Sequence, residues 1–516
     1  MDNRLYTEAQ VRAIEQAVCA SLPAGTLMRR AGEAAARFAL ELLGERKAGG
    51  GRPVLVLAGP GNNGGDALEV AANLADAGVD TTVLFQPGQH EISDEAQSAH
   101  ERARSGTVGF IDMLPPDGDW ALVIDGLFGI GLARPLEGDY RDMVASVNAL
   151  RCPVLALDVP SGLDADTGAI VGKGAGKGAD KGAGNGAGPD GIAVRATHTI
   201  TFLGDKPGLH TLDGRDHAGH VRVEMLGVDP QQLPAPAARL GTADLFAACL
   251  APRRHNTHKG SFGDVVVLGG SHGMLGAPVL AARGALHAGA GRVFVAMLDA
   301  GPGCDSVQPE LMFRQADDVD FTGRTVVIGP GMGDSASAMR LLAKALDSDS
   351  PLVIDADAIT LIGASPDLLA RLAARSAPGV LTPHPLEASR LLGMTTAAIQ
   401  ADRLAAACEI ASRTQAAAIL KGSGSVIARP DGEVVVNPTG NAGLATAGSG
   451  DVLAGICGAL LAQGWPAWEA ALGAAWIHGA AADLLVAHGI GPIGMTAGEV
   501  PAAARAVLNL LVAEGS

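Results

Sequence analysis

The stretch VLVLAGPGNNGGDALEVAANLAD, residues 54–76, decides the fold of the N-terminal half of this chain. Its apolar run at 54–59 predicts a short buried strand, and a Gly/Asn loop follows that run. From Ala67 to Asp76 the apolar residues then recur at helical spacing. A strand that is apolar on both faces requires helices on both sides of a parallel sheet. The stretch therefore predicts an α/β fold.

Apolar runs of the same kind recur along the chain, separated by helical stretches. In the first half, helical periodicity over 7–43 precedes TTVLF (81–85), ALVID (121–125), CPVLALDV (152–159) and THTITF (197–202), where we expect the first unit to close. In the second half the runs are DVVVLGG (264–270), RVFVAML (292–298), TVVIGPG (325–331), PLVIDADA (351–358), GVLTPHP (379–385) and AAAILKG (416–422). Because the motifs of the two halves differ, we predict two distinct α/β domains and not a duplication.

The length of 516 residues also favours more than one domain. The Pro/Ala stretch DPQQLPAPAARL (229–240) predicts a linker between domains at 1–228 and 241–516. Within the first domain, 10 of the 24 residues of GAIVGKGAGKGADKGAGNGAGPDG (168–191) are glycine. Such a segment has little apolar surface to bury, so we expect a solvated surface insertion. Its lysines could bind an anion, but we assign it no function.

Composition excludes several classes of partner. The chain carries 38 Lys and Arg against 55 Asp and Glu, a net charge of −17, and has no dense basic stripe. We therefore expect neither nucleic acid nor a membrane as a partner. The N-terminus is polar and acidic, and six scattered cysteines lack a CxxC pair, so we expect a cytoplasmic protein without disulfides. We also expect a homo-oligomer, although the apolar helices of 466–487 could serve an interface or the core equally well.

Oxygen-bearing side chains follow three of the strands in the first half. Asn63, Asp125 and Ser161 stand at strand exits, and the carboxyl ends of parallel strands converge on one crevice. Oxygen ligands suit a hard cation. Each residue alone is explained equally well as a helix cap or a turn residue. Together they favour a binding site, although the loop at 58–70 lacks the G-x-G-x-x-G spacing and the P-loop lysine.

Four motifs of the first half resemble the NAD(P)H-hydrate epimerase domain. They are GNNGGD (61–66), DGLFGIGLARP (125–135), DVPSG (158–162) and TFLGDKPGL (201–209). The resemblance implies a Rossmann-like three-layer fold, bound K⁺, and interconversion of the R and S forms at C6 of the hydrated nicotinamide ring. K⁺ is expected at Asn63, Asp125 and Ser161.

The same resemblance implies the substrate contacts and the catalytic groups of this domain. Asp158 is expected to transfer protons, because opening and closing the ring at C6 needs an acid/base group, and Lys206 to assist it. The chain departs from the family at Ala67, where glycine is usual, and at Ile130, where threonine is usual. The expected substrate contacts are Asn62, Asn63, Gly64, Gly65, Asp66, Gly129, Ile130, Gly131, Leu132, Ala133, Arg134, Pro135 and Asp158.

The most informative stretch of the second half is NPTGNAGLATAGSGDVLAGICGALLAQG (437–464). Gly448, Ser449 and Gly450 precede an apolar helix, whose first N–H groups can bind an anion. Asp451 at that helix start could be an ordinary first-turn acid, or a base that removes a proton from a hydroxyl attacking a phosphate. The GSGD sequence resembles the ribokinase-like kinases, in which this aspartate is the base.

The other loops of the second half resemble ADP/ATP-dependent NAD(P)H-hydrate dehydratase, a ribokinase-like α/β fold. They are HKGSFGDVVVLGGSHGMLGAPVLAARGALHAGAGRV (258–293), QPELM (308–312), GPGMG (329–333), DADAI (355–359) and TPHPLE (382–387). The resemblance implies contacts of the hydrated cofactor with Ala277, Gly331 and His384, and activation of its C6 hydroxyl by Asp451. His384 is otherwise explained as a structural residue beside Pro385. The expected nucleotide contacts are Lys421, Gly422, Ser423, Gly424, Ser425 and Gly450.

Together the two resemblances imply repair of hydrated NADH and NADPH by epimerisation of both forms and nucleotide-dependent dehydration of the S form. Bacterial members use ADP and others ATP, and the fused arrangement indicates ADP, with Mg²⁺ offsetting its charge. The alternative is a small-alcohol kinase of the ribokinase type fused to a non-catalytic binding or scaffold domain. The presence of Asn63, Asp125 and Asp158 argues against a non-catalytic first domain. A small-alcohol kinase would share GSGD but would not be expected to carry the HKG and TPHP-x-E sets together.

Overall fold

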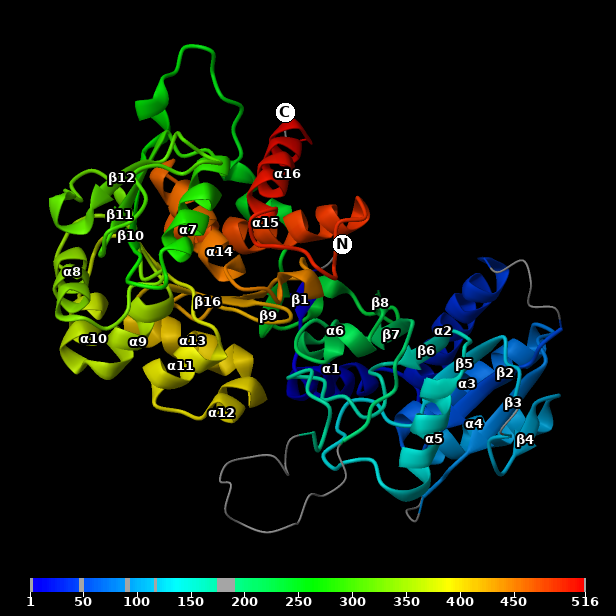
Figure 1. The fold of residues 1–516 in the computed structure, drawn as a ribbon. Helices are drawn as coiled ribbons and strands as arrows, with labels where there is room; N and C mark the ends of the chain where they lie inside the picture. Colours follow the sequence, from blue (N-terminus) through cyan, green and yellow to red (C-terminus); the bar gives the residue numbers. More distant parts are fainter. Residues whose placement is uncertain (1–2, 46–50, 89–92, 116–117, 174–190, 515–516) are drawn as a thin grey trace, which may run out of the picture. The chain divides into compact units, whose positions relative to one another are not determined.

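The structure, a computed structural model, describes residues 3–45, 51–88, 93–115, 118–173 and 191–514 (Figure 1). It divides into two compact units, Met1–Ala238 and Arg239–Ser516. The division falls inside 229–240, the segment for which we predicted a linker, and the last three residues of that segment form a strand. The insertion predicted at 168–191 lies outside the described residues except at its two ends.

The first unit contains a sheet of parallel strands in the order β4-β3-β2-β5-β6-β7-β8. The strands of this sheet are β2 (Val54–Ala58), β3 (Thr81–Phe85), β4 (Gly109–Ile111), β5 (Leu122–Gly126), β6 (Val154–Leu157), β7 (His198–Phe202) and β8 (His220–Glu224), and the unit also contains the short strand β1 (Arg4–Leu5). Its helices are α1 (Glu8–Cys19), α2 (Thr26–Glu45), α3 (Asn62–Asp76), α4 (Asp94–Ser105), α5 (Gly138–Ala149) and α6 (Gly214–His217).

Alternate residues of the central strand β2 enter two different cores. Val54 and Val56 pack with the buried faces of α2, α3 and α4, whereas Leu55 and Leu57 pack with α5 on the other side of the sheet. All four side chains are fully buried. The period of two along a strand thus produces helix, sheet and helix layers. The predicted Rossmann-like three-layer fold is confirmed.

Two expectations for this unit need correction. The helical region at 7–43 is two helices, because Pro23 and Gly25, which has a φ of +70°, interrupt it between Cys19 and Thr26. The sheet also does not close at 197–202 but continues to β8. The sequence of β8, HVRVE, alternates apolar and polar residues, as an edge strand with exposed positions does, so a search for apolar runs missed it.

The second unit is built on a sheet in the order β9-β18-β17-β16-β15-β14-β13-β10-β11-β12. Its strands are β9 (Ala238–Leu240), β10 (Asp264–Gly269), β11 (Arg292–Met297), β12 (Met312–Gln315), β13 (Thr325–Ile328), β14 (Leu352–Ile354), β15 (Gly379–Leu381), β16 (Ala417–Leu420), β17 (Val426–Ala428) and β18 (Val434–Val436). Its helices are α7 (Gly276–His287), α8 (Ala336–Leu346), α9 (Ala356–Ala364), α10 (Pro366–Ala373), α11 (Pro385–Leu392), α12 (Thr396–Ala401), α13 (Arg403–Thr414), α14 (Ser449–Ala462), α15 (Ala467–Ala487) and α16 (Val500–Glu514).

Helices cover both faces of this sheet as well. Strand pairs are parallel except that β17 runs antiparallel to β16 and to β18. Helices α7, α14 and α15 pack on the face that carries Val265 and Val267, and α9 and α11 lie on the other side (Figure 1). The run predicted as a strand at 351–358 is divided, because β14 ends at Ile354 and α9 begins at Ala356.

Helix α15 settles the question left open for 466–487. It is long and apolar enough to cross a membrane by length and composition, but 67% of its most apolar window is buried inside the structure. Its buried face packs with α14 and α16 in one apolar cluster. The helix is therefore part of the core of the second unit.

Candidate active sites

The first unit contains a cavity of about 920 Å³ at the point where its strand order reverses. Strand β2 lies between β3 and β5, so the loops that leave β2 and β5 part to opposite sides and open a crevice. Residues from the ends of β2, β5 and β6 reach this crevice together. The predicted contacts that line it are Asn62, Asn63, Asp66, Gly129, Ile130, Gly131, Leu132, Ala133, Arg134, Pro135 and Asp158.

Two predicted contacts, Gly64 and Gly65, do not line the cavity but lie buried in α3. A Cβ on Gly64 would stand 1.9 Å from the carbonyl oxygen of Gly59, and one on Gly65 would stand 2.5 Å from Cε of Met28. Both distances are shorter than real side-chain contacts. These glycines therefore allow the start of α3 to lie close to the end of β2 and to α2.

Asp158 is held by several donors at the wall of the cavity. Its side chain accepts hydrogen bonds from Lys206 Nζ at 2.6 Å and from the Ile130 N–H at 3.2 Å. Lys206 is fully buried and also donates to Thr201 Oγ1 at 2.7 Å and to the Phe202 carbonyl at 2.8 Å. Asp158 has a φ of +64°, an uncommon conformation for a residue with a side chain. Lys206 therefore reaches a bound molecule only through Asp158.

The two departures from the family pattern have different surroundings. Ala67 lies inside α3, fully buried, and its methyl faces Gly126, on which a Cβ would stand 2.4 Å from that of Ala67. Helical backbone suits alanine, so Ala67 needs no special conformation. Ile130 contributes its backbone N–H to Asp158, while its side chain packs on apolar neighbours. Neither departure removes a polar group from Asp158.

Of the three residues predicted as K⁺ ligands, Asn63 lines the cavity, whereas Asp125 and Ser161 are buried and do not line it. Asp125 is fully buried and accepts from the Ser161 N–H at 2.8 Å and from Ser161 Oγ at 2.7 Å. Burial raises the pKa of Asp125 to about 6 in spite of these bonds. Asn63 is 8% exposed, and among the residues that the structure describes neither atom of its side-chain amide has a hydrogen-bond partner. A buried amide without a partner is costly, so an oxygen-binding cation fits this donor set.

Further carboxyl groups face the cavity that sequence motifs did not identify. Glu15, from α1, lines the cavity, and its pKa is raised first by burial and then by the nearby Asp158. Asp66 is half-buried, and burial, Asp158 and Glu15 raise its pKa well above the ordinary value. Arg12 also lines the cavity, with its guanidinium against Gly131. Residues of α1 carry no motif, so only their position in the fold identifies them.

In the second unit the strand order reverses around β10, which lies between β11 and β13. The loops after β10 and β13 carry two predicted substrate contacts. Gly331 has a φ of +57° and is buried, and a Cβ on it would stand 3.3 Å from that of Ala277 in the first turn of α7. The Gly331 carbonyl accepts from the Ser271 N–H at 2.7 Å. The structure therefore brings Ala277 and Gly331 together.

Asp451 lies in the first turn of α14, where Gly448 is the N-cap with a φ of +90°. Lys421 lies against this turn, because a Cβ on Gly450 would stand 3.1 Å from Lys421 Nζ. Burial and then the Asp355 carboxylate raise the pKa of Asp451 to about 7, although Lys421 opposes them. A carboxyl with this pKa can exchange a proton at neutral pH.

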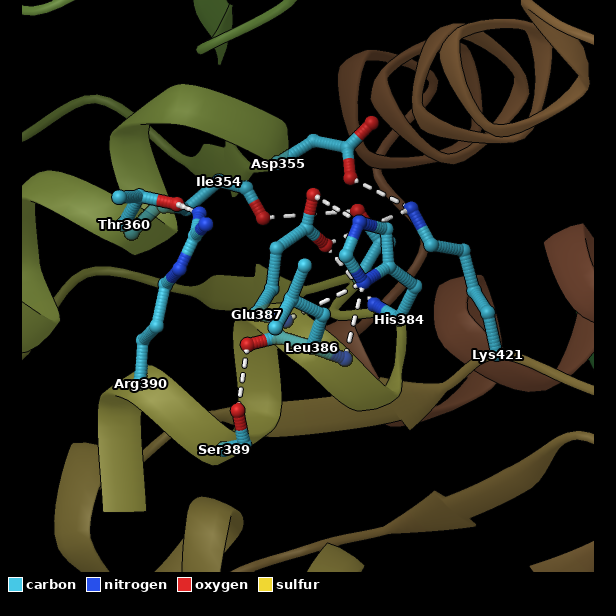
Figure 2. Close-up of polar contacts among 10 residues, drawn as sticks. Ile354, Asp355, Thr360, His384, Leu386, Glu387, Ser389, Arg390 and Lys421 are labelled. Atoms are coloured by element: carbon cyan, nitrogen blue, oxygen red, sulfur yellow. Dashed lines mark hydrogen bonds and ion pairs between the residues drawn. The ribbon is translucent and has the colours of Figure 1, made fainter. Parts of the chain in front are cut away.

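Lys421 also lies beside two carboxyl groups to which the sequence assigned no role, those of Asp355 and Glu387 (Figure 2). Lys421 Nζ donates to Asp355 Oδ1 at 2.9 Å and stands 3.9 Å from Glu387 Oε2. Burial raises the pKa of Glu387 to about 7 against the effect of Lys421. Asp355 belongs to the DADAI motif and Glu387 to the TPHPLE motif. The motifs therefore identified the correct loops, but not the contact of these two carboxyl groups with Lys421.

His384 caps the N-terminus of α11 and is fixed in one tautomer. Its Nδ1 accepts from the N–H groups of Leu386 and Glu387, both at 3.1 Å. Burial and then Lys421 lower the pKa of His384, so the ring is neutral and carries its proton on Nε2, 3.2 Å from Glu387 Oε1. His384 is thus a structural cap, and its half-buried ring presents an N–H donor and not a base.

The predicted nucleotide loop, 421–425, is held by hydrogen bonds from the buried side chain of Arg403, a residue that no motif indicated. Arg403 is 1% exposed and donates to the carbonyls of Leu420, Ser423 and Gly424 at 3.1 to 3.2 Å. Burial lowers the pKa of Arg403 to about 10. Gly422 and Ser423 are exposed on the other side of the loop. The loop shape therefore depends on a buried cation of α13.

Comparisons with known proteins match both units. A family model described as YjeF-related protein N-terminus matches residues 24–208, and one described as NAD(P)H-hydrate dehydratase matches residues 265–501. The bifunctional NAD(P)H-hydrate repair enzyme Nnr of Escherichia coli is 35% identical over 94% of this chain and 89% of its own length. That of Coxiella burnetii is 35% identical over 98% and 99%. The crystal structure of ADP/ATP-dependent NAD(P)H-hydrate dehydratase from Bacillus subtilis, co-crystallised with ATP/Mg²⁺, is 30% identical, with a TM-score of 0.46, over 53% of this chain and 98% of that one.

Proposed function

The chain belongs to the family of bifunctional NAD(P)H-hydrate repair enzymes, and from that premise we propose which of its residues perform the two reactions. The enzyme combines an NAD(P)H-hydrate epimerase with an ADP-dependent NAD(P)H-hydrate dehydratase, and the small-alcohol kinase alternative is less well supported. We assign epimerisation to residues 1–228 and dehydration to residues 241–516, with 229–240 as the linker.

The dehydratase assignment is carried by one observation, the position of Asp451 at the start of α14 beside the Lys421 ammonium. Asp451 removes the proton from the C6 hydroxyl of the hydrate, and the hydroxyl oxygen attacks the terminal phosphoryl group of ADP. The N–H groups of the first turn of α14, with Gly450, hold the phosphate that is attacked. Lys421 to Ser425 hold the nucleotide.

The second half of the dehydration follows from the chemistry of the ring. Water is a poor leaving group, whereas the phosphate ester formed at C6 departs with help from the ring nitrogen. Loss of a proton from C5 then restores the dihydronicotinamide, and AMP and phosphate are the other products. Ala277 and Gly331 line the place of the ring, and the Nε2–H of His384 donates to it.

For the epimerase we propose that Asp158 takes the proton of the C6 hydroxyl when the ring opens and returns it when the ring closes. Lys206 acts as a positioning residue, because it contacts Asp158 and is itself fully buried. The cavity residues Asn62 to Asp66 and Gly129 to Pro135 surround the substrate, with Gly64 and Gly65 acting by shaping the start of α3.

We propose K⁺ in the first unit and Mg²⁺ in the second. Asn63, Asp125 and Ser161 would hold K⁺, which supports the loop after β5; the unpaired amide of Asn63 supports this assignment. Among the described residues no three His, Cys, Asp or Glu side chains form a metal-binding group, so Mg²⁺ would bind largely through the nucleotide phosphates, whose charge it offsets.

We further propose a cytoplasmic homo-oligomer that acts on small molecules alone, with no nucleic acid or membrane partner. The net charge of −17 supports the exclusion of polyanionic partners.

The experiment supplies racemic hydrated NADH with ADP, or with ATP, and follows the recovery of reduced-nicotinamide absorbance. We expect full recovery with ADP, because epimerisation feeds the R form to the dehydratase. Recovery that stops near half, after correction for spontaneous epimerisation, would contradict the epimerase assignment. Absence of recovery with either nucleotide would contradict the dehydratase assignment.

A further inference from the structure

Epimerisation through an open ring moves two protons, and one carboxylate cannot supply both movements at once. Opening breaks the C6–N1 bond: the hydroxyl loses its proton as the C6 carbonyl forms, and N1 gains a proton as it receives the electron pair. The site therefore needs a proton acceptor and a proton donor at the same moment. This inference rests on the function proposed above.

Asp158 is equipped only to accept. Every contact that its carboxylate makes is a hydrogen bond that it receives, from Lys206, from Thr201 Oγ1 at 3.4 Å and from the Ile130 N–H. The fully buried Lys206 ammonium compensates its charge. A second group must therefore donate to N1.

The cavity that Asp158 lines also contains other carboxyl groups. Asp66 projects from the second turn of α3, and the α1 residue Glu15 lines the cavity with it. Within the described part of the chain, neither carboxyl forms a hydrogen bond or an ion pair, although both are partly buried. Asn63, also on the cavity wall, is nine-tenths buried with its amide unpaired, which marks this wall as built for a ligand. We propose that Asp66 is the proton donor to N1 of the hydrated nicotinamide, paired with Asp158 as the acceptor.

The groups that face Asp66 keep its proton in place. Burial, Asp158 from the end of β6, Glu15 from α1 and Glu69 from its own helix all raise the pKa of Asp66. Two nearby cations are engaged by other carboxylates, because Lys206 is bonded to Asp158 and Arg12 donates to Glu8 at 2.8 Å. A third cation, Arg134, lines the cavity. A carboxyl group whose pKa is raised is suited to donate a proton, and Asp158, which only receives hydrogen bonds, is suited to accept one.

The steps balance without an additional reagent. On opening, the hydroxyl proton passes to Asp158 and the Asp66 proton passes to N1. Rotation about the C5–C6 bond turns the other face of the aldehyde to N1. On closing, N1 attacks C6 and returns its proton to Asp66, and the new hydroxyl oxygen takes the proton from Asp158. The enzyme ends in its starting state, and only the configuration at C6 has changed.

The test uses the full chain with Asp66→Asn, an isosteric change that keeps hydrogen bonding but removes the transferable proton. Pure R hydrate with excess ADP reports epimerisation, and pure S hydrate reports dehydration in the same molecule. We expect epimerisation to fall on the order of 10²- to 10⁴-fold and dehydration to stay at the wild-type rate. Asp94→Asn, an exposed aspartate of α4, is the matched control and should change neither rate.

The pH profile separates proton donation from a structural role. Because the donor must be protonated, wild-type epimerisation should decline as the pH rises through the raised pKa of Asp66. Glu15→Gln removes a negative charge beside Asp66, so this decline should move to lower pH. An Asp66→Asn enzyme with epimerisation within a few-fold of wild type, or a Glu15→Gln profile that does not move, would overturn the proposal. Loss of epimerisation in the wild type itself would instead contradict the epimerase assignment.

Discussion

Each of the two sites sets one aspartate that we propose to be catalytic beside one lysine, but the two lysines differ in how many carboxyl groups surround them. In the first unit Lys206 meets one carboxylate, that of Asp158, and spends its other donors on a hydroxyl and a carbonyl. In the second unit Lys421 lies between Asp355 and Glu387, and the carboxyl of Asp451 is a further acid beside it. One cation thus serves one acid in the first site and several in the second.

From this contrast we infer that the number of carboxyl groups per buried cation determines which of them carries a proton at neutral pH. Burial disfavours every carboxylate, and a single ammonium cannot compensate three. Asp451 and Glu387 therefore both reach a pKa of about 7. The second site is therefore prepared for proton removal near neutral pH, whereas in the first site the Lys206 ammonium is bonded to the Asp158 carboxylate at 2.6 Å.

The largest effect is expected from replacing Asp451, which shares Lys421 with two other carboxyl groups. Asp451→Asn should lower dehydration on the order of 10²- to 10⁴-fold, because the amide cannot take the hydroxyl proton. Exchange between the R and S forms, followed by chromatography, should keep the wild-type rate. A parallel fall of both activities would contradict the division of labour between the units.

Removing the cation of the first site should be costly to folding. Lys206→Met leaves the Asp158 charge buried without its partner, so the first unit should lose about 3–5 kcal/mol of stability. Calorimetric melting of the full chain measures this as a lower transition for the first unit. Lys173→Met is the control: it breaks an exposed ion pair with Asp213, at 2.6 Å, and should cost less than about 1 kcal/mol. Equal effects of the two changes would show that Lys206 contributes no more than a surface lysine.

The shared lysine of the second site predicts a pH dependence. Dehydration needs Asp451 unprotonated, so kcat/KM for the S hydrate should fall about tenfold per pH unit below pH 7. Glu387→Gln removes one of the carboxyl groups that raise the pKa of Asp451, so the fall should move to lower pH. Stopped-flow absorbance measures this pH profile. A profile that is flat between pH 5 and 8 would argue against Asp451 as the base.

The smallest effect is expected at Ala67. Ala67→Gly restores the residue usual in the family but weakens the interior of α3, so the first unit should lose about 1 kcal/mol. The epimerisation rate should not change, because the Ala67 methyl faces Gly126 and not the cavity. A rise in epimerisation would show that the methyl hinders the site after all. Denaturant unfolding measures the stability of the variant, and epimer exchange measured on the same samples gives its rate. The two measurements separate a loss of stability from a change in activity.

Local sequence predicted eight of the strands to within one or two residues, because strands buried on both faces are continuous apolar runs, as β3 and β10 are. It could not predict the edge strand β8, whose alternation is shared by exposed segments. Motifs marked the loops of both sites, but they could not show that Gly64 is a packing residue. Nor could they indicate Glu15 or Arg403, since each lies in a helix far along the chain from the loop it faces and is brought there by the tertiary fold.

Arg403 has a mechanical consequence. It is the first residue of α13, a helix capped by the Asp402 side chain on the Ala405 N–H, and its guanidinium holds three carbonyls of the loop around Lys421. We therefore expect the loop and the first turn of α13 to be stabilised together, so that a ligand bound to the loop also stabilises that turn. Amide hydrogen exchange at the start of α13, a surface remote in sequence from every catalytic residue, should slow when nucleotide binds.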